Sequence, residues 1–128
     1  MDATLLLIHG DRDEDVRFRS AILGAHPSLR LHIARHPREV DLYPVPKLIL
    51  LDLDLCQPPA IKMLEWLRSS RLYDRIPLIV LSSSRETDQV TRALELGALS
   101  CVLKPVNTTL LDGIAKGIGM YVKLLASQ

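Results

Sequence analysis

The chain has 128 residues, of which 48% are hydrophobic and 24% are charged, and 16 Lys and Arg against 15 Asp and Glu give a formal net charge of +1. This length fits one domain with a core of its own, so we expect residues 1–128 to form a single domain with no output domain. The charge balance argues against nucleic acid or an anionic membrane as a partner. Two cysteines, Cys56 and Cys101, are too few for a disulfide framework, and neither a leader peptide nor a membrane-length apolar run is present, so a cytoplasmic location is expected.

The first half of the chain predicts three strands and two helices. Apolar runs at residues 4–8 and 47–51 indicate strands buried on both faces, and alternation over residues 29–33 indicates a half-exposed edge strand. A helix is expected from about residue 13 until Gly24, and a weak helix over residues 37–42. The apolar residues of the first helix fall near helical spacing: Val16, Phe18, Ile22 and Leu23.

The second half predicts three helices and two strands. Residues 60–71 form an amphipathic helix, residues 78–81 a buried strand that runs into Ser82, and residues 101–105 a strand that ends in a cation. A helix over residues 86–96 ends at Gly97 as a left-handed terminator, and the last helix covers residues 108–126. The helix over residues 86–96 is expected to bury Val90, Ala93, Leu94 and Leu96. Five strands alternating with five helices predict an α/β fold with a parallel sheet and helices on both faces.

Three predicted strands end in side chains that carry chemistry: Asp52, Ser82 and Lys104. The carboxyl ends of parallel strands meet at one edge of the sheet, where ligands bind in open α/β folds. A carboxylate nucleophile, a hydroxyl donor and a cation are what an acyl-phosphate site requires. The alternative is structural, with Lys104 in a salt bridge to Asp52 and Ser82 capping a loop.

Four stretches, at residues 48–55, 76–84, 95–98 and 104–106, resemble those of a response-regulator receiver domain. The segment from residue 64 to residue 77 is most similar to stand-alone receivers that work with phytochrome-type histidine kinases. The resemblance implies a flavodoxin-like (βα)5 doubly wound sheet of order 2-1-3-4-5, a role in two-component phosphorelay signalling and no enzymatic turnover beyond self-phosphorylation. It implies a histidine kinase or phosphotransfer protein as partner. It also implies Asp52 as phosphoacceptor, Ser82 as switch hydroxyl, Lys104 as the conserved lysine and Pro105 as a cis-peptide candidate.

The chain departs from the receiver pattern in the residues that hold Mg²⁺. His9 and Gly10 stand where receivers have an acidic pair, and Asp11 comes one residue late. Asp52 and the backbone carbonyl of Asp54 remain as ligands, and Mg²⁺ prefers oxygen ligands, so we expect weakened Mg²⁺ binding and impaired phosphorylation. Cys101 replaces the switch aromatic residue on the fifth strand and is expected to pack as a small side chain.

Two other functions fit parts of the sequence. A phosphorylation-independent pseudo-receiver would dock to a partner, or to a second copy as a homodimer, through the last two helices and the fifth strand. Gly113, Gly117 and Gly119 make the last helix thin there, although close packing on the sheet would also explain them. The Asp52 motif also resembles haloacid-dehalogenase-like phosphohydrolases, a distant alternative because Asp112 is the sole acidic residue after Lys104.

Overall fold

Strands and helices alternate five times in the computed structural model, which describes residues 3–8, 12–25, 27, 29–54, 59–84, 86–104 and 108–126. The strands are β1 (Ala3–Ile8), β2 (Leu29–Ala34), β3 (Leu48–Asp52), β4 (Leu78–Ser82) and β5 (Ser100–Leu103). The helices are α1 (Arg12–Ala25), α2 (Pro37–Val40), α3 (Ala60–Ser69), α4 (Asp88–Glu95) and α5 (Thr108–Ala126). The predicted series of elements is confirmed.

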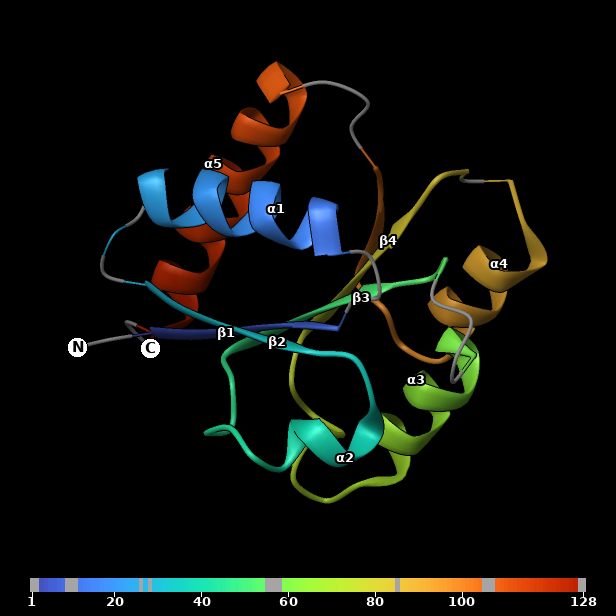
Figure 1. Ribbon diagram of the computed structural model, residues 1–128. Coiled ribbons are helices and arrows are strands. Elements are labelled where there is room, and N and C mark those ends of the chain that lie inside the picture. The colour runs from blue at the N-terminus through green and yellow to red at the C-terminus, as the bar shows by residue number, and fades with distance from the viewer. Residues whose placement is uncertain are drawn as a thin grey trace.

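The five strands form one parallel sheet in the order β2-β1-β3-β4-β5, as predicted. Helices α1 and α5 lie on one face of the sheet, and α2, α3 and α4 lie on the other (Figure 1). The register places Asp52 beside Leu81 of β4, and Ser82 beside Leu103 of β5. The carboxyl ends of β3, β4 and β5 therefore lie next to one another at one edge of the sheet.

Each face of the sheet has its own apolar core. Leu5, Leu7 and Leu50 pack under α1 and α5, whereas Leu6, Ile49 and Leu51 pack under the helices of the other face. Both sides of β1 and β3 are covered, which explains their continuous runs of apolar residues. All five residues of β3 are buried, including its terminal Asp52.

Two apolar helix residues are exposed. Leu94 of α4, which was expected to face inward, is 46% exposed, so that prediction is wrong, and Val16 of α1 is 65% exposed. Residues two apart on a helix lie about 200° apart, and the buried stripe of α1 passes through Phe18 and Ile22. In α4 the buried stripe is narrow and is made by Val90 and Ala93.

Gly97 ends the α4 region in the left-handed conformation that the sequence predicted. Its φ is +96°, which glycine adopts without a steric penalty. The Gly97 N–H donates to the Leu94 carbonyl at 3.0 Å, and the Ala98 N–H donates to the Ala93 carbonyl at 3.0 Å. These bonds satisfy carbonyls at the end of the helix and turn the chain into β5.

Candidate functional site

Asp52 is the last residue of the central strand β3 and is 3% exposed. The chain leaves the strand with the Leu53 N–H donating to the Leu81 carbonyl at 2.8 Å. One Asp52 carboxylate oxygen accepts from the Asp54 N–H at 2.9 Å. A buried carboxylate is stable when it is hydrogen-bonded and paired with a cation. The cation that pairs with Asp52 comes from the end of β5, two strands away in the sheet.

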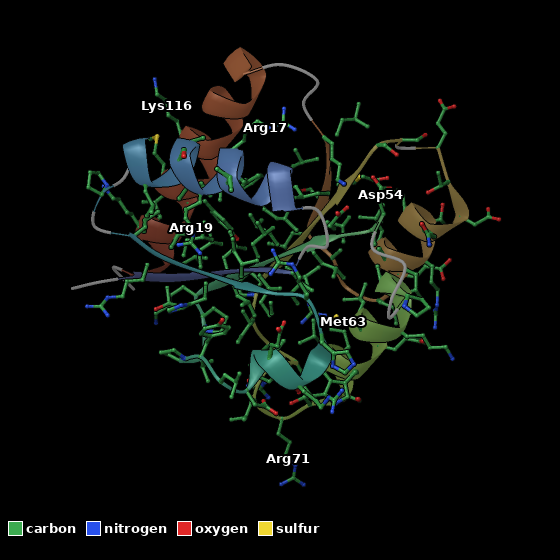
Figure 2. All side chains as sticks on the ribbon, in the orientation of Figure 1. Arg17, Arg19, Asp54, Met63, Arg71 and Lys116 are labelled. Carbon is green, nitrogen blue, oxygen red and sulfur yellow. The ribbon has the colours of Figure 1, made fainter. Side chains whose placement is uncertain are left out.

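Lys104 follows β5 and brings its ammonium group to Asp52. Its backbone N–H donates to the Ser82 carbonyl at 2.9 Å, which extends the β4–β5 pairing by one step. Its Nζ lies 2.9 Å from each carboxylate oxygen of Asp52 and 3.1 Å from Oδ2 of Asp54. The cluster of Asp52, Asp54 and Lys104 therefore joins two carboxylates and one ammonium at the edge of the sheet, where Figure 2 labels Asp54.

The surroundings of Lys104 change its pKa in two opposing ways. Burial by itself would lower the pKa, because it disfavours the charged form. The hydrogen bonds and negative charges of Asp52 and then Asp54 outweigh burial, so the pKa of Lys104 is raised above the ordinary lysine value. Lys104 is therefore an ammonium ion at neutral pH and offsets the charge of Asp52.

Ser82 ends β4 at the same edge but has partners of its own. Its hydroxyl donates to the Ser84 carbonyl at 2.7 Å and accepts from the Ser84 N–H at 3.2 Å. Ser82 thus caps the β4–α4 loop, as the structural interpretation of the sequence anticipated. The structure brings Asp52 and Lys104 into direct contact and leaves the Ser82 hydroxyl on its own loop.

The carboxylate of Asp54 was not part of the predicted cluster, since the sequence suggested a role for its backbone carbonyl alone. In the structure its Oδ2 pairs with Lys104 and its Oδ1 accepts from the Ser83 hydroxyl at 3.3 Å. Two carboxylates two residues apart, directly after a buried strand, were the signal that could have indicated this contact. Asp54 ties the loops after β3, β4 and β5 together.

The described residues bring no large cluster of metal-ligating side chains together. In residues 3–8, 12–25, 27, 29–54, 59–84, 86–104 and 108–126, no group of three or more His, Cys, Asp or Glu side chains is placed to hold a metal ion. The Lys104 ammonium already contacts both Asp52 and Asp54. His9, Gly10 and Asp11 lie outside the described residues, as does Pro105.

Cys101, which the resemblance to receivers assigned to the switch aromatic position, lies beside Val80 in the sheet register. It is partly buried and packs against the core under α3 and α4. This agrees with the expectation of a small packed side chain.

Among the described helices, none combines the length and the apolar character needed to cross a bilayer.

No family model matches the chain. Over 61 residues, or 48% of the chain, it is 34% identical to the two-component response regulator-like protein APRR1 of Arabidopsis thaliana, and the match spans 10% of that protein's length. In structure it is similar to the phosphorylated cyanobacterial phytochrome response regulator RcpA, with a TM-score of 0.83, 24% identity and 94% of each chain covered.

Two further solved structures are similar. The Mn²⁺-bound form of the response regulator Rcp1 has a TM-score of 0.79 and 24% identity, with 93% of each chain covered. The bacteriophytochrome response regulator RtBRR has a TM-score of 0.70 and 25% identity, with 91% of this chain and 79% of that chain covered. Together with the strand order, these similarities show that the chain has the receiver-domain fold of response regulators.

Proposed function

We propose that the chain, over residues 1–128, is a single receiver domain in two-component phosphorelay signalling, that Asp52 is its phosphoacceptor, and that its phosphorylation is impaired. The observation that carries the proposal is the contact of the buried Asp52 carboxylate with the Lys104 ammonium at the carboxyl edge of the sheet. The phosphoryl donor is a histidine kinase or phosphotransfer protein. A Lys-paired carboxylate at this edge offers a nucleophile beside a cation that offsets phosphoryl charge.

The reaction needs no oxidant or reductant. An Asp52 carboxylate oxygen forms a bond to the phosphorus of the donor phosphohistidine, the P–N bond breaks, and the departing histidine nitrogen keeps the electron pair and takes a proton. Lys104 then pairs with a phosphoryl oxygen in place of an Asp52 oxygen. Ser82 donates to another phosphoryl oxygen after giving up its 2.7 Å bond to the Ser84 carbonyl.

Two features support impairment. His9 and Gly10 replace the acidic pair that would supply metal ligands. Lys104 already neutralises much of the negative charge that would attract a divalent cation to Asp52 and Asp54. Weakened Mg²⁺ binding therefore leaves phosphoryl transfer with less charge stabilisation.

The test is intact-mass spectrometry after incubation with acetyl phosphate, with and without Mg²⁺. We expect a slow and incomplete gain of about 80 Da, one phosphoryl group, that Mg²⁺ hardly accelerates and that Asp52→Asn abolishes. The double variant His9→Asp/Gly10→Asp restores the acidic pair and is expected to react much faster with Mg²⁺. A wild-type rate equal to that of the restored variant would contradict impairment, and an unreactive restored variant would contradict Asp52 as phosphoacceptor.

A phosphorylation-independent docking module is the second candidate, because the outer face of α5 is exposed and partly apolar. Met120 and Leu124 are 60% and 62% exposed. Gly113 and Gly117 are also exposed, and a Cβ added to either would meet no atom of the described residues within 4 Å, so close packing against the described part of the chain does not explain these two glycines. The spacing of these four residues places them on one side of the helix.

The occupant that this candidate requires is a second copy of the chain. Size-exclusion chromatography with light scattering is expected to give a dimer mass that Met120→Lys converts to a monomer mass. The matched control Lys123→Met, which changes another exposed residue of α5, is expected to leave the dimer intact. A monomer mass for the wild-type chain at all concentrations would reject this candidate.

A further inference from the structure

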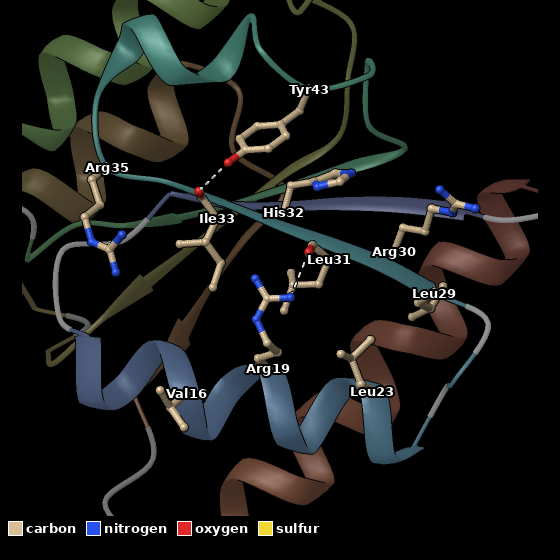
Figure 3. Close-up of a pocket in the computed structure, with 10 residues that line it drawn as sticks. All are labelled: Val16, Arg19, Leu23, Leu29, Arg30, Leu31, His32, Ile33, Arg35 and Tyr43. Atoms are coloured by element: carbon tan, nitrogen blue, oxygen red, sulfur yellow. Dashed lines mark hydrogen bonds between the residues drawn. The ribbon is translucent and has the colours of Figure 1, made fainter.

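A groove of about 800 Å³ runs along β2, at the edge of the sheet farthest from β5 (Figure 3). Side chains of α1 form one wall, and Tyr43, from the segment after α2, lies on the other side of the strand. None of the residues that line the groove belongs to the cluster of Asp52, Asp54 and Lys104. The groove is therefore separate from the proposed phosphorylation site.

The backbone of β2 faces the groove. The strand pairs with β1 on one side, and its other side is the end of the sheet. Two outward carbonyls have side-chain partners: Arg19 Nη1 donates to the Leu31 carbonyl at 3.3 Å, and the Tyr43 hydroxyl donates to the Ile33 carbonyl at 3.3 Å. In a parallel strand the N–H and C=O of one residue point to the same side, so the N–H groups of Leu31 and Ile33 also point outward.

The described side chains that line the groove carry charge of one sign. Among the residues whose side chains the structure describes, three arginines and no Asp or Glu line it, although the whole chain has a formal net charge of +1. Figure 3 shows Arg30 near the start of β2, Arg19 reaching its middle from α1, and Arg35 just beyond its end. At a rise of about 3.3 Å per residue, the span from Arg30 to Arg35 is roughly 16 Å.

The walls provide apolar and polar contacts as well. Val16 is 65% exposed on α1, and the His32 and Tyr43 rings stack with centroids 4.5 Å apart. Within the described part of the chain, His32 Nε2 is buried without a hydrogen-bond partner. A span of this length, with cations spaced along an open strand edge, fits an extended chain better than a single compact anion.

We propose that this groove docks an acidic, extended segment of a partner protein, which adds as a strand to β2 and places its carboxylates on Arg19, Arg30 and Arg35. Main-chain hydrogen bonds to Leu31 and Ile33 provide affinity, and the arginines select for acidic residues. The Arg19 and Tyr43 side chains cover the outward carbonyls until the segment displaces them. These two bonds protect the edge from pairing with arbitrary strands.

The first test is fluorescence anisotropy with a labelled eight-residue peptide that alternates Glu and Val, compared with peptides that carry Gln or Lys in place of Glu. We expect the Glu peptide to bind at least tenfold more tightly than the Gln peptide, and the Lys peptide not to bind. In ¹⁵N-correlated NMR spectra, the Glu peptide is expected to shift the amide signals of Leu31 and Ile33. No binding at millimolar peptide, or shifts confined to α4, β5 and α5, would overturn the proposal.

The second test uses arginine variants of the full chain. Arg19→Gln/Arg30→Gln replaces two exposed residues and is expected to weaken binding of the Glu peptide at least tenfold. The matched control is Arg71→Gln, since Arg71 is exposed and points away from the molecule far from the groove (Figure 2). Unchanged affinity of the double variant for the Glu peptide would overturn the proposal. Equally tight binding of a single-stranded oligonucleotide to the wild-type chain would also overturn it. Urea unfolding midpoints verify that both variants are folded.

Discussion

Replacing Lys104 with Met is expected to destabilise the protein strongly. The Lys104 and Asp52 side chains are 15% and 4% exposed, and Nζ lies 2.9 Å from each Asp52 carboxylate oxygen. Removing one partner of a buried ion pair costs about 3–5 kcal/mol, because the remaining charge is left without compensation. Asp54 is 36% exposed, so water solvates its carboxylate when Lys104 is removed, and losing this pairing adds little to the cost of Lys104→Met. We therefore expect Lys104→Met to lower the free energy of unfolding by about 3 kcal/mol.

The reverse substitution is expected to cost less. In Asp52→Asn the Lys104 ammonium keeps the Asp54 carboxylate at 3.1 Å, so no buried charge loses all compensation. The loss in the free energy of unfolding is then about 1.5–3 kcal/mol, the range for a hydrogen bond to a charged group. Lys62→Met, which changes an exposed residue of α3, is the control and is expected to stay within about 0.5 kcal/mol of the wild type.

The assay is equilibrium unfolding in urea, followed by the fluorescence of Trp66, the single tryptophan of the chain. Trp66 packs against the core under α3 and α4, so its emission reports the loss of that core. The double variant Lys104→Met/Asp52→Asn is expected to regain much of the stability lost in Lys104→Met, because both charges are then absent. If Lys104→Met loses less than Asp52→Asn, the cluster is solvated and the reasoning from buried charge is refuted.

Three further predictions use the same unfolding assay. Gly97→Ala should lower the free energy of unfolding by about 1–2 kcal/mol, because the φ of Gly97 is +96°. Gly24→Ala, at an exposed position of α1, should raise it by about 0.5–1 kcal/mol. If both substitutions change the free energy of unfolding in the same direction, the argument from backbone conformation is contradicted. Arg68→Lys should lower the free energy of unfolding by about 1–2 kcal/mol, because Arg68 Nη1 donates to three backbone carbonyls at 3.3, 2.9 and 3.2 Å. An unchanged urea midpoint in this variant would show that water replaces these hydrogen bonds. Burial and the 2.9 Å hydrogen bond to Asp41 raise the pKa of Tyr73 from 10.0 to about 12, so its stabilisation is present below pH 10 and is lost as the pH rises toward 12. Tyr73→Phe should therefore be less stable at pH 8 and lose less stability than the wild type from pH 10 to pH 12; parallel pH profiles would contradict this.

Most of the fold could be predicted from local patterns in the sequence. The continuous apolar runs that became β1, β3 and β4 can be satisfied only where helices cover both faces of a sheet. Helix ends were also readable where chemistry marks them, as at Gly97, whose positive φ terminates the α4 region. Asp52 could be placed because a carboxylate that ends a buried strand of a parallel sheet must lie at the carboxyl edge.

The sequence by itself determined the order of elements, the sheet and the positions of Asp52, Ser82 and Lys104 at strand ends, because each depends on neighbours in the chain. The tertiary structure decided which groups meet: Lys104 pairs with both Asp52 and Asp54, whereas the Ser82 hydroxyl bonds to Ser84. The arginine-lined groove along β2 was also invisible in the sequence. Arg30 and Arg35 lie on and next to β2, but Arg19 joins them only because α1 packs beside the edge strand, a contact between distant segments that no local pattern records.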